Sequence, residues 1–226
     1  MNFTYYGHSC FAVEVSGRVL LFDPFITPNP QAAAIDVKAL RADYILVSHG
    51  HQDHLADAVG LAKRTGATVL ANYEVATWLG RQGAGKVHPL NHGGGCAFDF
   101  GRVKLVNAIH SSSMPDGSYG GNPGGFVVES APGNFYYSGD TALTMDMKLI
   151  GESTPLAFAV LCVGGNFTMD TADAVKAADF IGCREIVGVH YDTFPPIKID
   201  HEEARKKFQA AGKTLHLLKI GDSRQF

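Results

Sequence analysis

The chain has 226 residues and a net charge of −3 at pH 7, and 46% of its residues are hydrophobic. This length is sufficient for one large core, so we expect a single domain over residues 1–226. The slightly acidic balance gives no reason to expect a nucleic-acid partner. The longest apolar run, residues 156–163, is far shorter than the roughly 20 residues that cross a bilayer, so we expect no membrane partner.

The four cysteines, at positions 10, 96, 162 and 183, form no CxxC pair. Each stands beside apolar residues, which is typical of small buried side chains in a reducing compartment. The first residues of the chain lack the charged and long apolar regions of a signal peptide. We therefore expect a cytoplasmic protein.

Hydrophobic patterning predicts a first strand at the amino terminus and then a hairpin of residues 10–15 and 19–22. A loop rich in Pro and Asn follows at residues 25–35. Strands at 44–48 and 68–71 then alternate with helices at 55–64 and 74–81, and the first helix should end at Gly66.

The second half repeats this order. Hairpins are expected from strands 98–100 and 103–109, and from strands 126–129 and 135–138, with a Gly- and Ser-rich loop at 111–125 between them. Strands at 156–163, 185–189 and 214–220 then alternate with helices at 171–181, capped by Asp170 or Thr171, and at 202–211. Hairpins followed by strand–helix alternation in both halves predict an α+β protein with two sheets packed face to face and helices outside.

A dense run of metal-binding side chains, His49-Gly50-His51-Gln52-Asp53-His54, directly follows the predicted strand at 44–48. Residues i and i+2 of an extended chain point the same way, so His49 and His51 can bind one metal ion. A turn at Gln52 would direct Asp53 and His54 toward a second position. A Zn²⁺ ion takes three or four nitrogen or oxygen ligands, so further ligands must come from elsewhere.

Three further candidates, His110, Asp140 and His190, stand where predicted strands end. Gly139 would permit close approach of the backbone beside Asp140. A lone histidine at a strand end is more often structural, but three candidates at matching positions favour a shared site. Because seven side chains exceed what one tetrahedral ion can use, we expect two divalent ions, Zn²⁺ first, with Mn²⁺, Fe²⁺ or Ni²⁺ as alternatives.

The order of these motifs resembles the metallo-β-lactamase superfamily over nearly the whole chain. The resemblance implies a four-layer αβ/βα sandwich. It also implies two ligand sets with a bridge between them: His49, His51 and His110 for one metal, Asp53, His54 and His190 for the other, and Asp140 bridging both. Asp23, after an early strand, would lie behind the ligand run and fix an imidazole.

Three segments, at residues 6–11, 163–169 and 190–195, are similar to the branch of small metal-dependent hydrolases related to L-ascorbate-6-phosphate lactonase. We therefore expect a hydrolase in which a hydroxide activated by two metals attacks an ester, lactone or phosphodiester bond of a small molecule. Asp53 is a candidate catalytic residue that would orient the nucleophile or carry a proton.

Three residues outside the ligand set are weaker candidates for the site. His8, in a turn that looks exposed, is a candidate proton donor at the rim of the cleft. Asn166 and Tyr191 are candidate substrate contacts. For each of the three, a purely structural role is the alternative.

Other functions on the same fold stay open. A mononuclear iron enzyme such as a persulfide dioxygenase would keep the same ligands, and one iron per chain would distinguish it. The absence of a long basic insertion disfavours a tRNA-processing nuclease. Asp140 stands where β-lactamases with two zincs generally have a thiolate, which disfavours that activity. A non-catalytic metal-binding protein would be expected to lose ligands, and none is missing.

Overall fold

Two seven-stranded sheets form the centre of the protein in a computed structural model that describes residues 1–226. The strands of the first sheet are β1 (Asn2–Gly7), β2 (Cys10–Val15), β3 (Arg18–Phe22), β4 (Tyr44–Leu46), β5 (Thr68–Asn72), β6 (Val87–Leu90) and β14 (Ser223–Gln225), in the order β14-β1-β2-β3-β4-β5-β6. Those of the second are β7 (Gly95–Phe98), β8 (Gly101–Asn107), β9 (Gly124–Glu129), β10 (Phe135–Tyr137), β11 (Phe158–Cys162), β12 (Glu185–Val189) and β13 (Thr214–His216), in the order β13-β12-β11-β10-β9-β8-β7.

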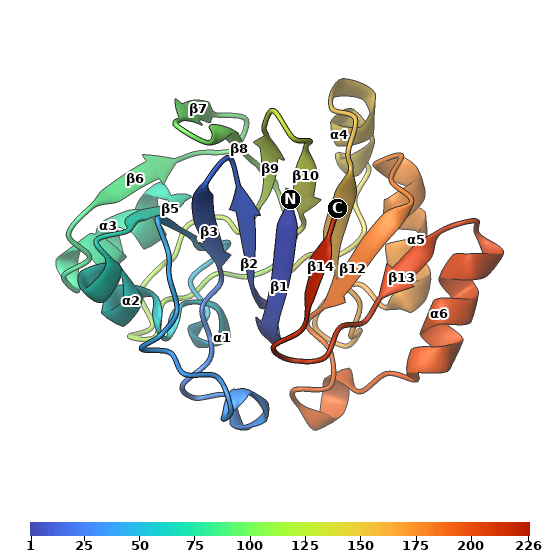
Figure 1. The fold of residues 1–226 in the computed structure, drawn as a ribbon, viewed down its shortest axis with the longest axis horizontal. Helices are drawn as coiled ribbons and strands as arrows, with labels where there is room; N and C mark the ends of the chain where they lie inside the picture. Colours follow the sequence, from blue (N-terminus) through green and yellow to red (C-terminus); the bar gives the residue numbers. More distant parts are fainter.

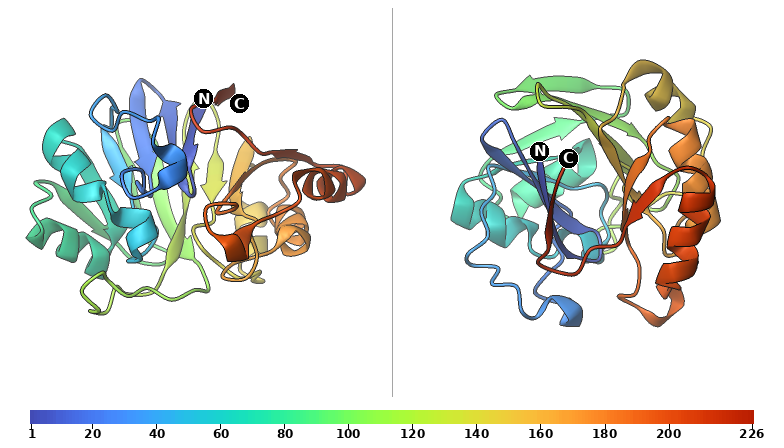
Figure 2. Two further views of the ribbon diagram at one scale, coloured as in Figure 1. Left: turned by 90° about the horizontal axis from the view of Figure 1, so that it is seen from below. Right: turned by 45° about the vertical axis from the view of Figure 1, so that its right-hand side comes forward.

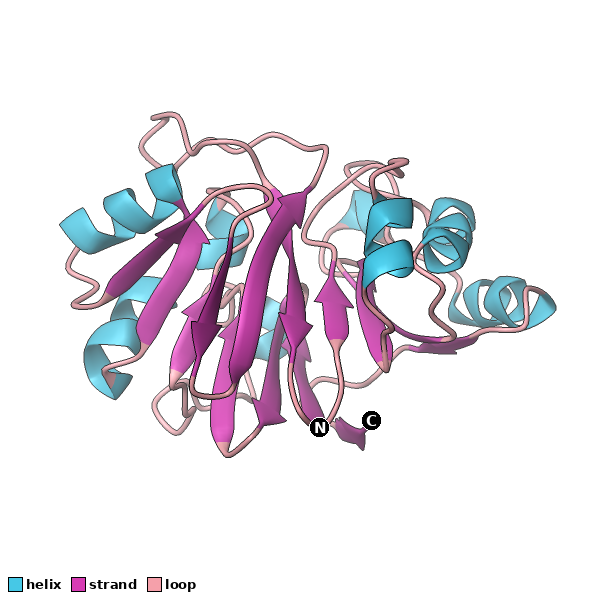
Figure 3. Cartoon of the chain, turned by 90° about the horizontal axis from the view of Figure 1, so that it is seen from above, coloured by secondary structure: helices cyan, strands magenta, loops and turns pink.

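Helices lie on the two outer sides of the sheets (Figures 1 and 3). On the side of the first sheet these are α1 (Gln52–Leu55), α2 (Ala58–Thr65) and α3 (Tyr73–Arg81), and on the side of the second they are α4 (Met147–Ser153), α5 (Thr171–Phe180) and α6 (His201–Ala210). Two short 3₁₀ helices, η1 (Pro30–Ala32) and η2 (Pro195–Ile197), complete the set. The layers confirm the predicted αβ/βα sandwich.

Aromatic side chains fill the space between the sheets. The rings of Phe11 and Phe22, from the first sheet, stack with their centroids 4.5 Å apart. Phe22 meets Tyr137 of the second sheet edge-on at 5.7 Å, and Phe135 stacks on Phe158 at 5.0 Å. All five rings are buried, and each contributes about 1.5–3 kcal/mol through removal of apolar surface from water. This core fixes the two sheets against each other.

The parallel parts of both sheets bring their carboxyl ends to one edge of the sandwich. Strands β3 to β6 are parallel neighbours, and so are β10 to β13. Backbone hydrogen bonds join the two sheets at this edge, from Gly124 N–H to the Ser48 carbonyl (3.1 Å) and from His190 N–H to the His8 carbonyl (2.9 Å). Figure 2 shows the ribbon of the two sheets and their connecting loops from two further directions. Loops that follow these strands therefore meet in one place.

The helix expected at 55–64 is α2, which ends at the left-handed Gly66 as predicted but begins later, because Leu55 belongs to the separate short helix α1 and a break lies between the two. At the break, the Asp57 carboxylate accepts hydrogen bonds from the backbone N–H groups of Ile26 (2.7 Å) and Thr27 (2.9 Å). Its own N–H donates to the Pro24 carbonyl. These contacts tie the loop after β3 to the ligand run, and they hold Asp57 outside a continuous helix.

Other boundaries differ by a few residues, and five elements were not predicted: β6, α4, β14 and the two 3₁₀ helices. The hairpin expected at 98–109 is formed by β7 and β8, and the strand expected at 214–220 ends at His216. Strand β6 contains Pro89, which weakens a strand pattern, and α4 and β14 are short. Asp170 caps α5 as expected, accepting hydrogen bonds from the N–H groups of Ala172 and Asp173. None of the helices combines the length and apolar character needed to cross a membrane.

Candidate metal centre

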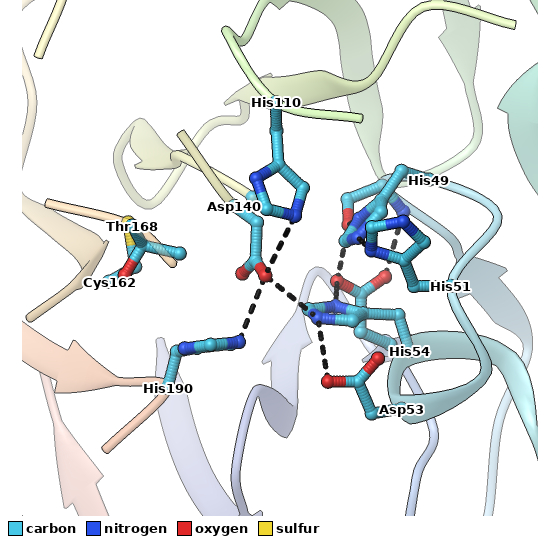
Figure 4. A network of polar contacts seen from close by, with 12 residues as sticks. His49, His51, Asp53, His54, His110, Asp140, Cys162, Thr168 and His190 are labelled. Carbon is cyan, nitrogen blue, oxygen red and sulfur yellow. Dashed lines mark hydrogen bonds and ion pairs between the residues drawn. The ribbon is translucent and has the colours of Figure 1, made fainter. Parts of the chain in front are cut away.

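The seven candidate ligands lie together at the edge where the parallel strands end (Figure 4). Asp140 lies in the middle of the cluster, in the loop after β10. Its Oδ2 atom is 2.9 Å from His190 Nε2, 3.2 Å from His54 Nε2 and 3.7 Å from His110 Nε2. One carboxylate therefore faces imidazoles that follow β8, β12 and β4.

Two groups of candidate ligand atoms adjoin this carboxylate, one through His110 and the other through His54 and His190. In the first, the donors of His49, His51 and His110 all lie within 4.8 Å of one another. In the second, the same holds for His8, Asp53, His54 and His190. The first group contains the three residues expected to hold one metal. The second group contains the three residues expected to hold the other metal, together with His8.

Asp23 is a buried anchor behind the ligands. Its carboxylate accepts hydrogen bonds from Ser48 N–H (2.7 Å), the Ser48 hydroxyl (2.6 Å) and the Tyr137 hydroxyl (2.6 Å). A carboxylate only accepts, so His54 must donate from Nδ1–H at 2.7 Å, which directs its Nε2 toward Asp140. The Ser48 hydroxyl uses its proton on Asp23 and so accepts from His49 Nδ1–H at 2.9 Å. Asp23 thus orients two imidazoles.

The donor set suits a divalent cation. His54 Nε2 and Asp140 Oδ1 are buried and have no hydrogen-bond partner, although buried polar atoms in proteins nearly always have one. His54 Nε2 lies at ion-pair distance from Asp140 Oδ2, but not in the geometry of a hydrogen bond. Imidazole nitrogens with carboxylate oxygens are the ligands that Zn²⁺, Mn²⁺, Fe²⁺ and Ni²⁺ accept. The residues therefore fit a metal site.

Electrostatics in the cluster favour a positive charge at its centre. Burial lowers the pKa of His49 well below its ordinary value, and burial also lowers the pKa of His51 and of His110, so these rings are neutral with lone pairs to offer. For His54, burial opposes ionisation, but Asp140 and the carboxylates beside it raise its pKa well above the ordinary value. The same carboxylates attract a bound cation.

His8 lies inside the site, so the expectation of an exposed turn is wrong. The residue is fully buried, because the rings of Phe25 and Phe194 pack on its imidazole with centroids 5.5 and 5.4 Å away. Its backbone has a positive φ of 53°. Its Nε2–H donates to Asp53 Oδ2 at 3.1 Å, and its Nδ1 accepts from the Thr193 hydroxyl at 2.9 Å. Burial lowers the pKa of His8 to about 4, so the ring is neutral.

Asp53 is the member of the second group that reaches solvent. Its side chain is 28% exposed, whereas that of His8 is fully covered. Burial alone would raise the pKa of Asp53, but the charge of His54 and the hydrogen bond from His8 hold the pKa below its ordinary value. An ionised carboxylate at the mouth of the site can bind a cation or accept a proton.

The two expected substrate contacts, Tyr191 and Asn166, differ in their exposure to solvent. Tyr191 is buried, stacks on Tyr5 at 6.4 Å and directs its hydroxyl to the Leu218 carbonyl at 3.4 Å. Its contact with substrate stays a prediction. Asn166 is exposed in the loop after β11, with a positive φ of 54°, and its contact with substrate stays a prediction.

The sequence reasoning missed two residues that orient the site, Ser48 and Thr193. Both stand beside predicted ligands, Ser48 directly before His49 and Thr193 three residues after His190. A hydroxyl next to a candidate ligand histidine is a signal that could have identified Ser48, because a ligand imidazole usually bonds a second group through its other nitrogen. Thr193 bonds His8 and not His190, so no local pattern indicates its role.

Comparisons with known proteins agree over the length of the chain. Residues 2–190 match the family model described as Beta-lactamase superfamily domain. A UPF0173 metal-dependent hydrolase from Flavobacterium johnsoniae is 56% identical over 223 residues, which cover 99% of both chains. A protein of the same name from Methylacidiphilum infernorum is 52% identical over 223 residues, again 99% of both.

A solved structure is similar in both sequence and fold. It is Igni18, described as a novel metallo hydrolase from the hyperthermophilic archaeon Ignicoccus hospitalis KIN4/I, with 33% identity and a TM-score of 0.89 over 100% of this chain and 98% of that one. All three relatives are named as hydrolases, so the iron-dependent redox alternative is not favoured. The relation to ascorbate-6-phosphate lactonase stays a prediction.

Proposed function

The chain belongs to the Beta-lactamase superfamily domain family and to the UPF0173 metal-dependent hydrolases, and we propose that it uses two divalent ions for hydrolysis. The bond cleaved would be an ester, lactone or phosphodiester bond of a small molecule. The observation that carries this proposal is the pair of donor groups that adjoin Asp140. A single ion would leave one group of three candidate ligands without a cation.

The proposed ligands follow from the two donor groups. His49, His51 and His110 would hold one ion, Asp53, His54 and His190 would hold the other, and Asp140 would lie between them. Zn²⁺ is the first expectation, and Mn²⁺, Fe²⁺ and Ni²⁺ bind the same atoms. When bound, such ions polarise the bond under attack and lower the pKa of water toward neutrality.

The protein's own residues orient the donors and handle the proton. Asp23 holds His54 and, through Ser48, His49, so that the donor nitrogens face the site before any ligand binds. The Asp53 carboxylate is ionised and reaches solvent, so it can accept a proton from an attacking water. The hydrogen bond from His8 fixes Asp53 Oδ2, which makes His8 a positioning residue in this proposal.

A double-mutant cycle tests the positioning role. His8→Asn should lower kcat in the otherwise intact protein. In an Asp53→Asn background, the same change should cost almost nothing further, because the group that His8 holds is already gone. Additive losses would show that His8 acts only on the stability of the site.

The proposed function is tested by metal analysis of the protein as isolated, joined to a hydrolysis screen of esters, lactones, thioesters, phosphodiesters and β-lactams. We expect two divalent ions per chain and turnover of an ester, lactone or phosphodiester. His110→Ala should lose metal and turnover. His88→Ala serves as the matched control, since His88 lies in β6 and its ring packs against Phe98. One iron per chain with no hydrolysis of any compound would contradict the proposal.

A further inference from the structure

A cavity lined mainly by residues with hydroxyl or amide side chains opens directly beside the proposed metal centre. It has a volume of about 460 Å³ and begins at His110. Hydroxyl and amide groups line it, from Ser111, Ser112, Ser113, Ser118, Tyr119 and Asn122. Ser111 Oγ lies 3.4 Å from His51 Nε2, so the cavity adjoins the first donor group. A substrate bound at the metal centre could extend its non-reacting part into this cavity.

The segments nearest the candidate ligands contain no lysine and no arginine. These segments are residues 8–9, 23–36, 47–57, 108–123, 138–146, 163–170 and 190–197. The loops after β3 and β12 continue to Lys38, Arg41 and Lys198, which are exposed and do not line the cavity. Proteins that select phosphate or carboxylate groups usually supply an ammonium or a guanidinium to pair with them. No lysine or arginine lines the cavity to do so.

The charged side chains beside the cavity are acidic. A Cβ atom added at Gly121 would lie 2.5 Å from Glu74 Oε2, so this carboxylate lies directly behind the cavity wall. Asp116 accepts hydrogen bonds from Ser118 N–H (2.9 Å), the Ser118 hydroxyl (2.6 Å) and Trp78 Nε1–H (2.7 Å). These bonds hold the pKa of Asp116 at about 2, and it is therefore ionised at neutral pH. An anionic group in the cavity would face like charge.

We propose, building on the hydrolase function above, that the substrate is an uncharged ester or lactone whose hydroxyl or amide groups occupy the cavity beside His110. Water adds to the carbonyl carbon and the bond from that carbon to the alkoxy oxygen breaks. One water proton passes to the departing alcohol, and the acid product ionises and releases a proton. The cavity does not favour a phosphorylated substrate such as the one named in the resemblance to ascorbate-6-phosphate lactonase, nor an anionic phosphodiester.

The proposal is tested with pairs of compounds that differ only in charge. The metal-loaded protein is assayed by proton release with glucono-δ-lactone and its 6-phosphate, and with methyl succinamate and monomethyl succinate. We expect kcat/KM to be at least about tenfold higher for the neutral member of a pair that is hydrolysed. Equal rates, or a preference for the anionic member, would overturn the inference and leave the hydrolase function standing.

A charge introduced into the cavity provides the matched variant. Asn122 is exposed at the cavity, and its Oδ1 accepts from the Tyr119 hydroxyl at 3.2 Å. Asn122→Lys should shift the neutral-to-anionic ratio of kcat/KM toward the anionic compound by about tenfold. Asn122→Gln, which keeps the amide, should leave that ratio unchanged. An unchanged ratio in the lysine variant would show that substrate does not enter this cavity.

Binding provides a readout that does not depend on turnover. Trp78 is the one tryptophan of the chain and is hydrogen-bonded to Asp116 at the cavity, so its fluorescence should report occupancy. We expect 1,5-anhydroglucitol, which has no bond to hydrolyse, to change this fluorescence saturably, and its 6-phosphate to bind more weakly. If no ester, lactone or phosphodiester is hydrolysed but this preference is seen, the proposed function fails and the cavity assignment holds. Tighter binding of the 6-phosphate, or no change with either compound, would overturn the assignment.

Discussion

Replacement of Asp23 by alanine should damage both the fold and the metal centre. Asp23 lies at the end of β3, is fully buried and accepts four hydrogen bonds from Ser48, His54 and Tyr137. Asp23→Ala removes the carboxylate that accepts all four bonds. It leaves a small void among donor groups that cannot turn to solvent. His54 also loses the bond that directs its Nε2 toward Asp140.

The size of the effect follows from these contacts. Each buried donor left without a partner costs about 1–3 kcal/mol, and water entering the void recovers part of this. The buried carboxylate also no longer has to be desolvated, which offsets a further part. We therefore expect a loss of about 3–5 kcal/mol in the free energy of unfolding. Loss of a group that orients a ligand imidazole lowers metal affinity by about 10–100-fold, and here two imidazoles depend on one carboxylate.

The assay is urea unfolding of metal-free protein followed by Trp78 fluorescence, together with metal affinity measured against a competing chelator. Asp99→Ala is the control, because Asp99 is 46% exposed and pairs with Arg18 at 2.6 Å on the surface. An exposed pair contributes about 0–1 kcal/mol, so this variant should be nearly as stable as the parent. If Asp23→Ala lost no more stability than the control and kept its metal affinity, the anchoring role assigned to Asp23 would be refuted.

Three further variants probe the centre of the site. Asp140→Ala should lower the metal content more than His110→Ala, because two cations would lose a shared carboxylate; equal retention of metal would exclude a bridge. Asp53→Asn should keep the fold and lose about 10²–10⁴-fold in turnover, and unchanged turnover of a fully metallated variant would remove Asp53 from the mechanism. Gly139→Ala should destabilise by at least about 2 kcal/mol in thermal unfolding, since Gly139 has φ 59° and a Cβ there would lie 2.5 Å from the Gly124 carbonyl oxygen. A smaller shift would show that the backbone can move away.

The candidate ligand positions could be predicted from the sequence because they stand in segments that follow strands β4, β8, β10 and β12. Strand patterns with a histidine or aspartate at their carboxyl end predict a shared edge, and the structure brings His110, Asp140 and His190 to that edge. The sandwich could be predicted for a related reason, since hairpins and strand–helix alternation repeat in both halves. The extent of the single domain over residues 1–226 stays a prediction.

The environment of His8 could not be predicted, because the residues that bury it are distant in the sequence. Phe25 and Phe194 pack on the ring from two separate loops, and Asp53 and Thr193 bond its nitrogens. A local pattern shows only a turn after a strand. The break between α1 and α2 is similar, since it depends on bonds between Asp57 and a loop some 30 residues earlier.

The number and position of bound metals test the central claim most directly. Anomalous diffraction from crystals of metal-loaded protein, collected at the absorption edge of the metal found by elemental analysis, would locate each ion. The account predicts two peaks per chain, one among His49, His51 and His110 and the other among Asp53, His54 and His190, with Asp140 between them. One peak per chain at full occupancy, or peaks outside these two groups, would contradict it.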